Sequence, residues 1–389
     1  MTQKIKFLII IFLNVLILFF LLDFFIGKKI EKIIFFPKIS QILLDKQEIG
    51  TKNLDYHHTI KKNLNVKTSD AIGGWKNAIK FEYKVCSNEY GMRIDCEQKN
   101  ETNKNNTKNY DVMFIGDSFT FGLGLDYDKT FVGIVQNQLK YLKIGNMGVN
   151  SYSPTLYYLK TKKFLEDNFK IKELIVFIDI SDIQDEFQRS KIHQALLNNE
   201  VKNLSEITEG VIIEKKVNQK QKLKKNVKFI LRDKFPFSYR LLYEIKYFYL
   251  PQPKYRYHYG YNRSVWSYDQ KLANYDVQFG IKSSIRSMDK LFELLSKNNI
   301  KLSVAVYPWV NNLLYDKKNS KAVKIWENFC KNKCYRFYNY FDDFFENKNK
   351  LSKKEALRLI KQYYLTGDTH LNFEGNKLIA KKIILDIKK

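Results

Sequence analysis

The most regular pattern along the chain is an apolar run near its beginning, from Phe7 to Gly27. As a helix, these residues would span about 31 Å, close to the thickness of a bilayer core. The run is too long for the apolar part of a signal peptide, and no small-residue cleavage site follows it. We therefore predict an uncleaved transmembrane anchor over residues 7–27, behind a short tail of residues 1–6. A buried core helix is the alternative.

Two polar residues, Asn14 and Asp23, interrupt this run. Asp23 lies near one end of the predicted span, where its carboxylate can reach the membrane interface at moderate cost. The lysines on the two sides of the span do not decide its orientation.

Beyond residue 110, short apolar runs alternate with segments that have apolar residues at helical spacing. The runs VMFIG, IGNMGV and ELIVFIDI are typical of buried parallel strands. This β-α-β-α-β order predicts an α/β fold in which helices cover both faces of a parallel sheet. The alternation stops over about residues 186–265 and then resumes, which indicates an inserted cap. We therefore expect a stalk and N-terminal extension over 28–109 and one capped domain over 110–389.

The composition excludes one class of partner. The formal net charge is +26, but the positive residues are mostly lysines, whereas specific nucleic-acid recognition favours the arginine fork. No nucleic-acid partner is expected. The basic run from Lys215 to Lys228 is either a solvated helix face or a contact for an acidic glycan or a membrane surface. The tyrosine-rich run that follows is either half-buried packing or a sugar-binding cleft.

Four cysteines fall into two locally spaced pairs, Cys86 with Cys96 and Cys330 with Cys334. There is no Cys-x-x-Cys, and no histidine lies close to either pair, so a zinc site is not expected. Two disulfides would suit an oxidising compartment, although spacing alone does not establish pairing and four free thiols in a cytosolic protein are the alternative. With the anchor, this predicts a single-pass inner-membrane protein whose main domain faces the periplasm.

The first predicted strand of the sheet ends at Gly-Asp-Ser, which places Ser118 at its carboxyl end. Ligands bind at that edge of a doubly wound sheet. The residues after Ser118 would open a helix, whose N-terminal amides favour negative charge. A serine hydroxyl is a nucleophile only when a base takes its proton. His370, in GDTHLNFEGN, is the candidate base, and Asp368 can orient it. The alternative is that both residues only cap a turn.

An acyl-transfer site also needs hydrogen-bond donors for the oxyanion. The backbone amide of Ser118 is the first candidate. The amide of Gly148, in NMGVNSYSP, is the second, because glycine lets its N–H approach a substrate closely. A third donor should come from the end of the next strand, in IVFIDISDIQDE.

Four segments, FIGDSFTFGLGL, NMGVNSYSP, IVFIDISDIQDE and GDTHLNFEGN, resemble in order the conserved blocks of the SGNH hydrolases, the GDSL-type esterase superfamily. SNEYGMR also resembles a segment found in many bacterial members. The resemblance covers about residues 80–185 and 275–389. It implies a three-layer α/β/α flavodoxin-like fold, with Ser118 as nucleophile, His370 as base and Asp368 as its partner. The short Asp-x-His spacing resembles the membrane-anchored bacterial branch.

The third block departs from the family pattern Gly-x-Asn-Asp, in which the Asn side chain is an oxyanion donor. Here Ser181 stands at the Asn position. Its hydroxyl can donate one hydrogen bond, with a different reach. Asn150 is an alternative donor.

Together with the predicted anchor, the resemblance gives our first hypothesis, a membrane-anchored serine esterase, and no metal or organic cofactor is indicated. Its expected substrates are O-acyl esters of cell-envelope carbohydrate, above all O-acetyl esters, cleaved through an acyl-enzyme. An O-acetyltransferase with the same triad is an alternative, because water access to the acyl-enzyme decides between hydrolysis and transfer. A lipid esterase or thioesterase and a non-catalytic glycan-binding protein of this fold are further alternatives.

Overall fold

The computed structural model describes residues 3–35, 47–72, 79–97, 108–207, 231–249, 261–269 and 275–388. The described residues form two compact units. The smaller unit contains helices α1 (Gln3–Phe35) and α10 (Pro236–Tyr249), and the larger unit contains the described strands.

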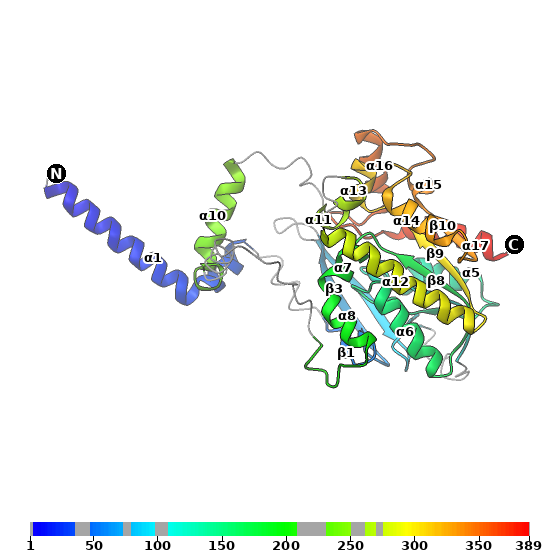
Figure 1. Cartoon of the computed structure of the whole chain (residues 1–389). Helices are drawn as coiled ribbons and strands as arrows, with labels where there is room; N and C mark the ends of the chain where they lie inside the picture. Colours follow the sequence, from blue (N-terminus) through cyan, green and yellow to red (C-terminus); the bar gives the residue numbers. More distant parts are fainter. Residues whose placement is uncertain are drawn as a thin grey trace. The chain divides into compact units, whose positions relative to one another are not determined.

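An eight-stranded sheet forms the centre of the larger unit, in the order β10-β9-β8-β6-β7-β5-β4-β3 (Figure 1). The parallel strands, in chain order, are β6 (Asn109–Ile115), β7 (Ile144–Asn146), β8 (Lys170–Ile178), β9 (Lys301–Val306) and β10 (Arg336–Asn339). Numbered among themselves, these strands have the flavodoxin-like order 2-1-3-4-5. The predicted α/β class with a parallel sheet is confirmed.

Helices lie on both faces of this sheet, as right-handed crossovers require (Figure 1). Helices α5 (Phe131–Gln138) and α17 (Phe373–Lys388) pack together on one face, and α6 (Pro154–Glu166) and α12 (Tyr275–Lys297) pack together on the other. Buried aromatic rings join the layers: the centroid of Phe131 in α5 lies 4.4 Å from that of Phe177 in β8.

Shorter elements complete the larger unit. They are β1 (Gly50–Asn53), β2 (His57–Ile60), α4 (Ser118–Phe121), η1 (Tyr127–Lys129), α7 (Asp182–Gln188), α8 (Ser190–Leu197), α11 (Tyr261–Ser264), η2 (Val265–Ser267), α13 (Val310–Tyr315), α14 (Lys321–Cys330), α15 (Phe341–Phe344) and α16 (Lys353–Tyr363).

The main sheet begins earlier in the chain than the expected boundary at residue 110. Strands β3 (Asn65–Ile72), β4 (Ile79–Ser87) and β5 (Arg93–Ile94) extend it by antiparallel pairing, and β5 pairs directly with β7. They cover a sheet edge that β7 would otherwise expose. The alternation of β4, in which Tyr83 and Val85 are buried and Lys84 is exposed, was the available signal.

The cap expected over residues 186–265 is not one body. Helix α8 belongs to the larger unit, whereas α10 packs against α1 in the smaller unit. The basic run and the part of the tyrosine-rich run over 250–260 lie outside the described residues.

The N-terminal apolar run forms helix α1, of which Gln3–Glu31 is long and apolar enough to cross a membrane, with a mean hydropathy of 3.0. A signal sequence near the N-terminus would also pass this test of length and hydropathy. The predicted helix is therefore present, and its insertion in a membrane belongs to the proposals below.

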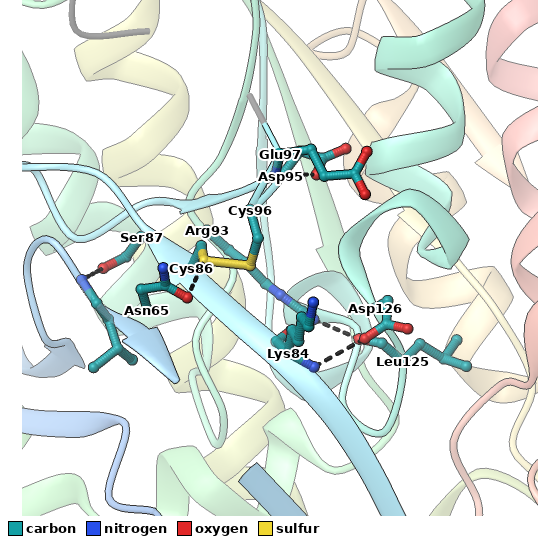
Figure 2. Close-up of a disulfide and its surroundings, with 11 residues drawn as sticks. Asn65, Lys84, Cys86, Ser87, Arg93, Asp95, Cys96, Glu97, Leu125 and Asp126 are labelled. Atoms are coloured by element: carbon teal, nitrogen blue, oxygen red, sulfur yellow. Dashed lines mark hydrogen bonds between the residues drawn. A yellow bond between two sulfur atoms is a disulfide. The ribbon is translucent and has the colours of Figure 1, made fainter. Parts of the chain in front are cut away.

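Both cysteine pairs of the sequence are joined in the larger unit, Cys86 to Cys96 and Cys330 to Cys334. Figure 2 shows that the first bond links β4 to the segment just after β5. The spacing of the cysteines left the pairing open, and the structure joins the two local pairs.

Candidate active site

The turn that carries Ser118 follows β6 directly, and local sterics determine its shape. A Cβ on Gly116 would lie 2.1 Å from the hydroxyl oxygen of Thr120, so only glycine fits there. Asp117 caps the following helix, because its carboxylate accepts the N–H of Phe119 at 3.0 Å. Ser118 is thereby placed at the first position of α4, at the carboxyl end of β6.

The structure brings the three predicted triad residues together. Ser118 Oγ lies 2.7 Å from His370 Nε2, and His370 Nδ1 lies 2.5 Å from Asp368 Oδ1. Asp368 Oδ1 also accepts the backbone N–H of His370 at 2.8 Å. Both contacts of the imidazole are within hydrogen-bond distance, which is the geometry a serine nucleophile and its base require.

A tight turn before α17 positions His370. The N–H of Leu365 donates to the His370 carbonyl at 2.9 Å, and the N–H of Asp368 donates to the Leu365 carbonyl at 3.0 Å. Asn372 caps α17 by accepting the N–H of Gly375 at 3.0 Å. The ring of Phe119, next to Ser118, lies 4.6 Å from the His370 ring and supports it from the side.

The electrostatics of the pair suit a general base. Burial disfavours the imidazolium, but the charge and hydrogen bond of Asp368 outweigh burial, so the pKa of His370 lies above its ordinary value. Burial alone would raise the pKa of Asp368, yet His370 and the backbone hydrogen bonds hold it below its usual range. Asp368 therefore stays ionised and stabilises the protonated imidazole.

Two of the predicted oxyanion donors are already used in this structure. The amide of Gly148 donates to the side-chain oxygen of Asn146 at 2.9 Å. The hydroxyl and the amide of Ser181 donate to Asp179 Oδ1 at 2.5 and 2.7 Å. Close packing also requires a glycine at position 148, because a Cβ there would lie 2.4 Å from the backbone nitrogen of Phe121. The amide of Ser118 stays available in principle, since the first helical position has no intrahelical acceptor.

The side-chain amide of Asn150, the alternative oxyanion donor, is buried. The N–H of Val149 donates to the Gly116 carbonyl at 3.1 Å, so Asn150 follows the point where its loop touches the nucleophile turn. Its side-chain oxygen is buried and has no hydrogen-bond partner within the described residues. Oxygen and nitrogen of such an amide are interchangeable by rotation. His58 holds the Asn150 carbonyl at 2.8 Å and so fixes this loop.

Sequence reasoning missed a cluster of three buried aspartates beside Ser118. Carboxylate oxygens of Asp117, Asp179 and Asp182 lie within 4.8 Å of one another. Asp117 follows β6 and the other two follow β8. The chain leaves these adjacent strands toward opposite faces of the sheet, which is the switch point of the fold. The sequence shows that each of these aspartates follows a predicted strand. It does not show that the two strands are neighbours in the sheet.

Hydrogen bonds and pKa shifts distinguish the three aspartates. Asp179 accepts the Tyr307 hydroxyl at 2.9 Å and the Trp309 Nε1–H at 2.6 Å, in addition to the two donors from Ser181. Burial, and then the Asp179 charge, raise the pKa of Asp117 to about 8. The same two causes raise the pKa of Asp182 well above its usual range.

A second missed residue, Arg93, holds the turn after the nucleophile helix. The fully buried guanidinium donates to the carbonyls of Phe121, Gly122 and Leu125, at 2.7 Å for Gly122. Figure 2 shows Arg93 reaching from β5 toward Leu125, close to the disulfide of Cys86. The fork of arginine suits several carbonyls at once. Arg93 lies in SNEYGMR, to which the sequence assigned no role.

Comparisons with known proteins give matches among solved structures. No protein-family model matches the chain, and no curated protein matches it significantly. A member of the lipolytic protein G-D-S-L family from Veillonella parvula DSM 2008 is 11% identical with a TM-score of 0.37, covering 72% of this chain and 98% of that one. A GDSL-like lipase from Bacteroides thetaiotaomicron VPI-5482 is 13% identical with a TM-score of 0.34, covering 75% of this chain and 97% of that one.

Both similar structures are GDSL-type lipolytic proteins. At these TM-scores the likeness does not decide the activity, which is argued below from Ser118, His370 and Asp368. Neither structure bears on the membrane-anchored branch.

The raised pKa of His370 predicts how the reactivity of Ser118 depends on pH. Labelling by a fluorophosphonate needs the neutral imidazole, so the rate should fall as the pH drops through a midpoint above 6.5. In Asp368→Asn, the charge that raises the pKa of His370 is lost and burial, which lowers this pKa, dominates. The midpoint should therefore move to lower pH. The plateau rate should also fall, by about 10²- to 10⁴-fold.

The measurement is the pH profile of the labelling rate, with the adduct located by mass spectrometry. Asp289→Asn is a matched control, because it removes a carboxylate from the surface ion pair with Lys333. An unchanged midpoint in Asp368→Asn would contradict the pairing described here.

The different surroundings of Asp179 and Asp182 predict effects of different size for two isosteric substitutions. Asp179→Asn turns one carboxylate oxygen into an NH₂ group, which must then face either the Ser181 N–H or the Trp309 Nε1–H, and both of these can only donate. The substitution should lower the free energy of unfolding by about 1–3 kcal/mol. In Asp182→Asn the amide replaces a carboxyl that is already neutral. Its retained oxygen can accept the Tyr157 hydroxyl and the Asp179 N–H as before. Urea unfolding at pH 7 should therefore place Asp182→Asn within about 1 kcal/mol of the parent. The reverse ranking would refute the charge assignment.

Proposed function

We propose that this chain is a serine ester hydrolase of the SGNH type, anchored to the inner membrane by α1. The observation behind the proposal is the continuous hydrogen-bonded set in which Ser118 Oγ meets His370 Nε2 at 2.7 Å and Asp368 holds the other ring nitrogen. A turn that only needed capping would not require this third contact to a serine 252 residues away.

The chemistry begins when Ser118 Oγ attacks the carbonyl carbon of an ester. His370 Nε2 takes the hydroxyl proton, and Asp368 stabilises the imidazolium that forms. Collapse of the tetrahedral intermediate breaks the bond to the alcohol, which leaves with the proton from His370. The acyl group is then bound to Ser118.

The second half of the reaction returns the enzyme to its starting state. His370 takes a proton from water, the hydroxide attacks the acyl-enzyme, and the released Ser118 oxygen recovers the proton. We assign oxyanion stabilisation to the Ser118 amide at the start of α4 and to the side chain of Asn150. This assignment replaces Gly148 and Ser181, whose donors serve Asn146 and Asp179.

The proposed substrates are O-acyl esters, above all O-acetyl esters, of carbohydrate in the cell envelope. An apolar N-terminal helix and two disulfides in the larger unit support a main domain on the periplasmic side. An O-acetyltransferase would use the same triad, with a sugar hydroxyl in place of water. The hydrogen-bonded triad disfavours the non-catalytic glycan-binding alternative.

The decisive experiment compares the parent with Ser118→Ala on p-nitrophenyl acetate. The parent should release p-nitrophenol, and the variant should lose at least about a thousandfold in kcat/KM, because no nucleophile remains. Added oligosaccharide acceptors distinguish transfer from hydrolysis by the mass of the product. Equal turnover by both proteins would exclude Ser118 as the nucleophile. Absence of turnover and of fluorophosphonate labelling in the parent would favour the binding protein.

The revised oxyanion assignment makes its own prediction. Asn150→Ala should lower kcat by about 10²- to 10³-fold with little change in KM, as loss of one oxyanion donor does. Ser181→Ala is the matched control, because it removes a hydroxyl that donates to Asp179 and should change kcat less than about tenfold. Steady-state kinetics on the same ester provide the comparison, and a larger loss in Ser181→Ala would restore the family-like donor.

A further inference from the structure

Asp23 is the most deeply buried side chain in the apolar stretch of helix α1, although it is a carboxylic acid. Asp23 is 2% exposed, whereas nearby apolar residues are open, with Phe25 at 76%. An ionised group at this depth of a membrane span is costly unless it has partners. The hydrogen-bond partners of Asp23 therefore identify the segment that packs against α1.

Asp23 caps helix α10. Its two carboxylate oxygens accept the N–H of Phe237 at 3.0 Å and the N–H of Ser238 at 2.7 Å. These amides lie in the first turn of α10, which begins at Pro236. The first amides of a helix lack intrahelical acceptors, and the helix dipole favours an anion there. The carboxylate and the start of the helix thus satisfy each other by direct hydrogen bonds.

Further contacts continue this docking along α1. The ring of Phe19 lies 6.0 Å from that of Phe237, and the ring of Phe20 lies 5.7 Å from that of Phe235. A Cβ on Gly27 would lie 3.3 Å from the Pro236 ring and only 1.9 Å from the Asp23 carboxylate, so glycine permits the close approach. The interface is built into both segments of the chain.

The position of this contact fixes its depth relative to the apolar span. Asp23 lies four residues before Gly27, which is about 6 Å along the helix. Lys28 follows and pairs with Asp233 at 3.0 Å. The start of α10 is thereby held at the end of the apolar run, where a bilayer gives way to headgroups.

Helix α10 cannot itself cross a membrane. Its 14 residues span about 21 Å, and it contains Arg240, Glu244 and Lys246. It still exposes apolar side chains on one face, with Leu241 at 37%, Leu242 at 66% and Ile245 at 45%. Short length, charges, tyrosines and an open apolar face are typical of a helix that lies in a membrane interface.

We propose that α10 is an interfacial membrane helix, docked on the anchor by Asp23, with its Leu241, Leu242 and Ile245 face in the lipid headgroup boundary. The occupant of that face is the bilayer, because α10 packs against α1, whose own apolar side chains are exposed along the predicted membrane span. This inference rests on the proposed membrane anchor. It assigns residues 236–249 of the 186–265 insertion to membrane attachment.

The test uses the full chain in vesicles of phosphatidylcholine and phosphatidylglycerol, with one added cysteine carrying an environment-sensitive fluorophore. The four native cysteines are disulfide-bonded and do not react. Leu242→Cys reports on α10, Ile17→Cys on the middle of α1, and Leu204→Cys on an exposed site of the larger unit. Lipids with a nitroxide near the headgroup or at the chain end measure depth.

The headgroup-level nitroxide should quench roughly half of the fluorescence at Leu242→Cys, and the chain-end nitroxide should quench Ile17→Cys. Leu204→Cys should be unquenched. Adding Asp23→Leu keeps the anchor apolar but removes the cap, so quenching at Leu242→Cys should fall while Ile17→Cys is unchanged.

An unquenched Leu242→Cys beside a quenched Ile17→Cys would overturn the proposal, including the case in which protein covers Leu242 and its emission is blue-shifted. If neither probe is quenched, the anchor and the interfacial helix both fail. Fluorophosphonate labelling of Ser118 in the same samples tests the esterase assignment separately.

Discussion

The hydrogen bond between Ser118 and His370 is the contact on which the functional interpretation depends, and it joins residues 252 positions apart. Neither partner is reactive alone: the hydroxyl needs a base, and the imidazole needs the carboxylate of Asp368 to be held in one orientation. The parallel sheet makes the contact possible. It fixes Ser118 at the end of β6, and the turn before α17 brings His370 to the same edge.

This arrangement is accompanied by an unusual concentration of acid. Asp117, Asp179 and Asp182 are buried side by side at the switch point, where two strand ends meet. Like charges at such distances in a low-dielectric interior repel strongly. The structure accommodates them by surrounding Asp179 with donors from Ser181, Tyr307 and Trp309, while the raised pKa values of Asp117 and Asp182 keep those two groups neutral. The nucleophile turn and the donor geometry of the third block are therefore parts of one buried network. That explains why the hydroxyl of Ser181 faces Asp179.

The smaller unit also contains a buried carboxyl group that is held by hydrogen bonds. Asp23 would be a defect in a lone membrane helix, but as the cap of α10 it joins two segments more than 200 residues apart. In both units a buried carboxylate is tolerated because backbone amides or hydroxyls are directed at it. A charge that is costly alone becomes a specific contact when its partners are preorganised.

The sequence by itself determined the elements and the chemistry that each short motif can perform. Apolar periodicity predicted the N-terminal helix and the alternating strands and helices, because the spacing of apolar residues differs between helices and buried strands. Gly-Asp-Ser at a strand end and Asp-x-His before the last helix identified Ser118, Asp368 and His370 as candidates. Only the tertiary structure decided which groups face each other. It joined β3, β4 and β5 to the main sheet, directed Gly148 to Asn146 and Ser181 to Asp179, and packed α10 against α1. These outcomes depend on contacts between distant segments, whose geometry is fixed by strand order and packing and leaves no periodic trace in the chain.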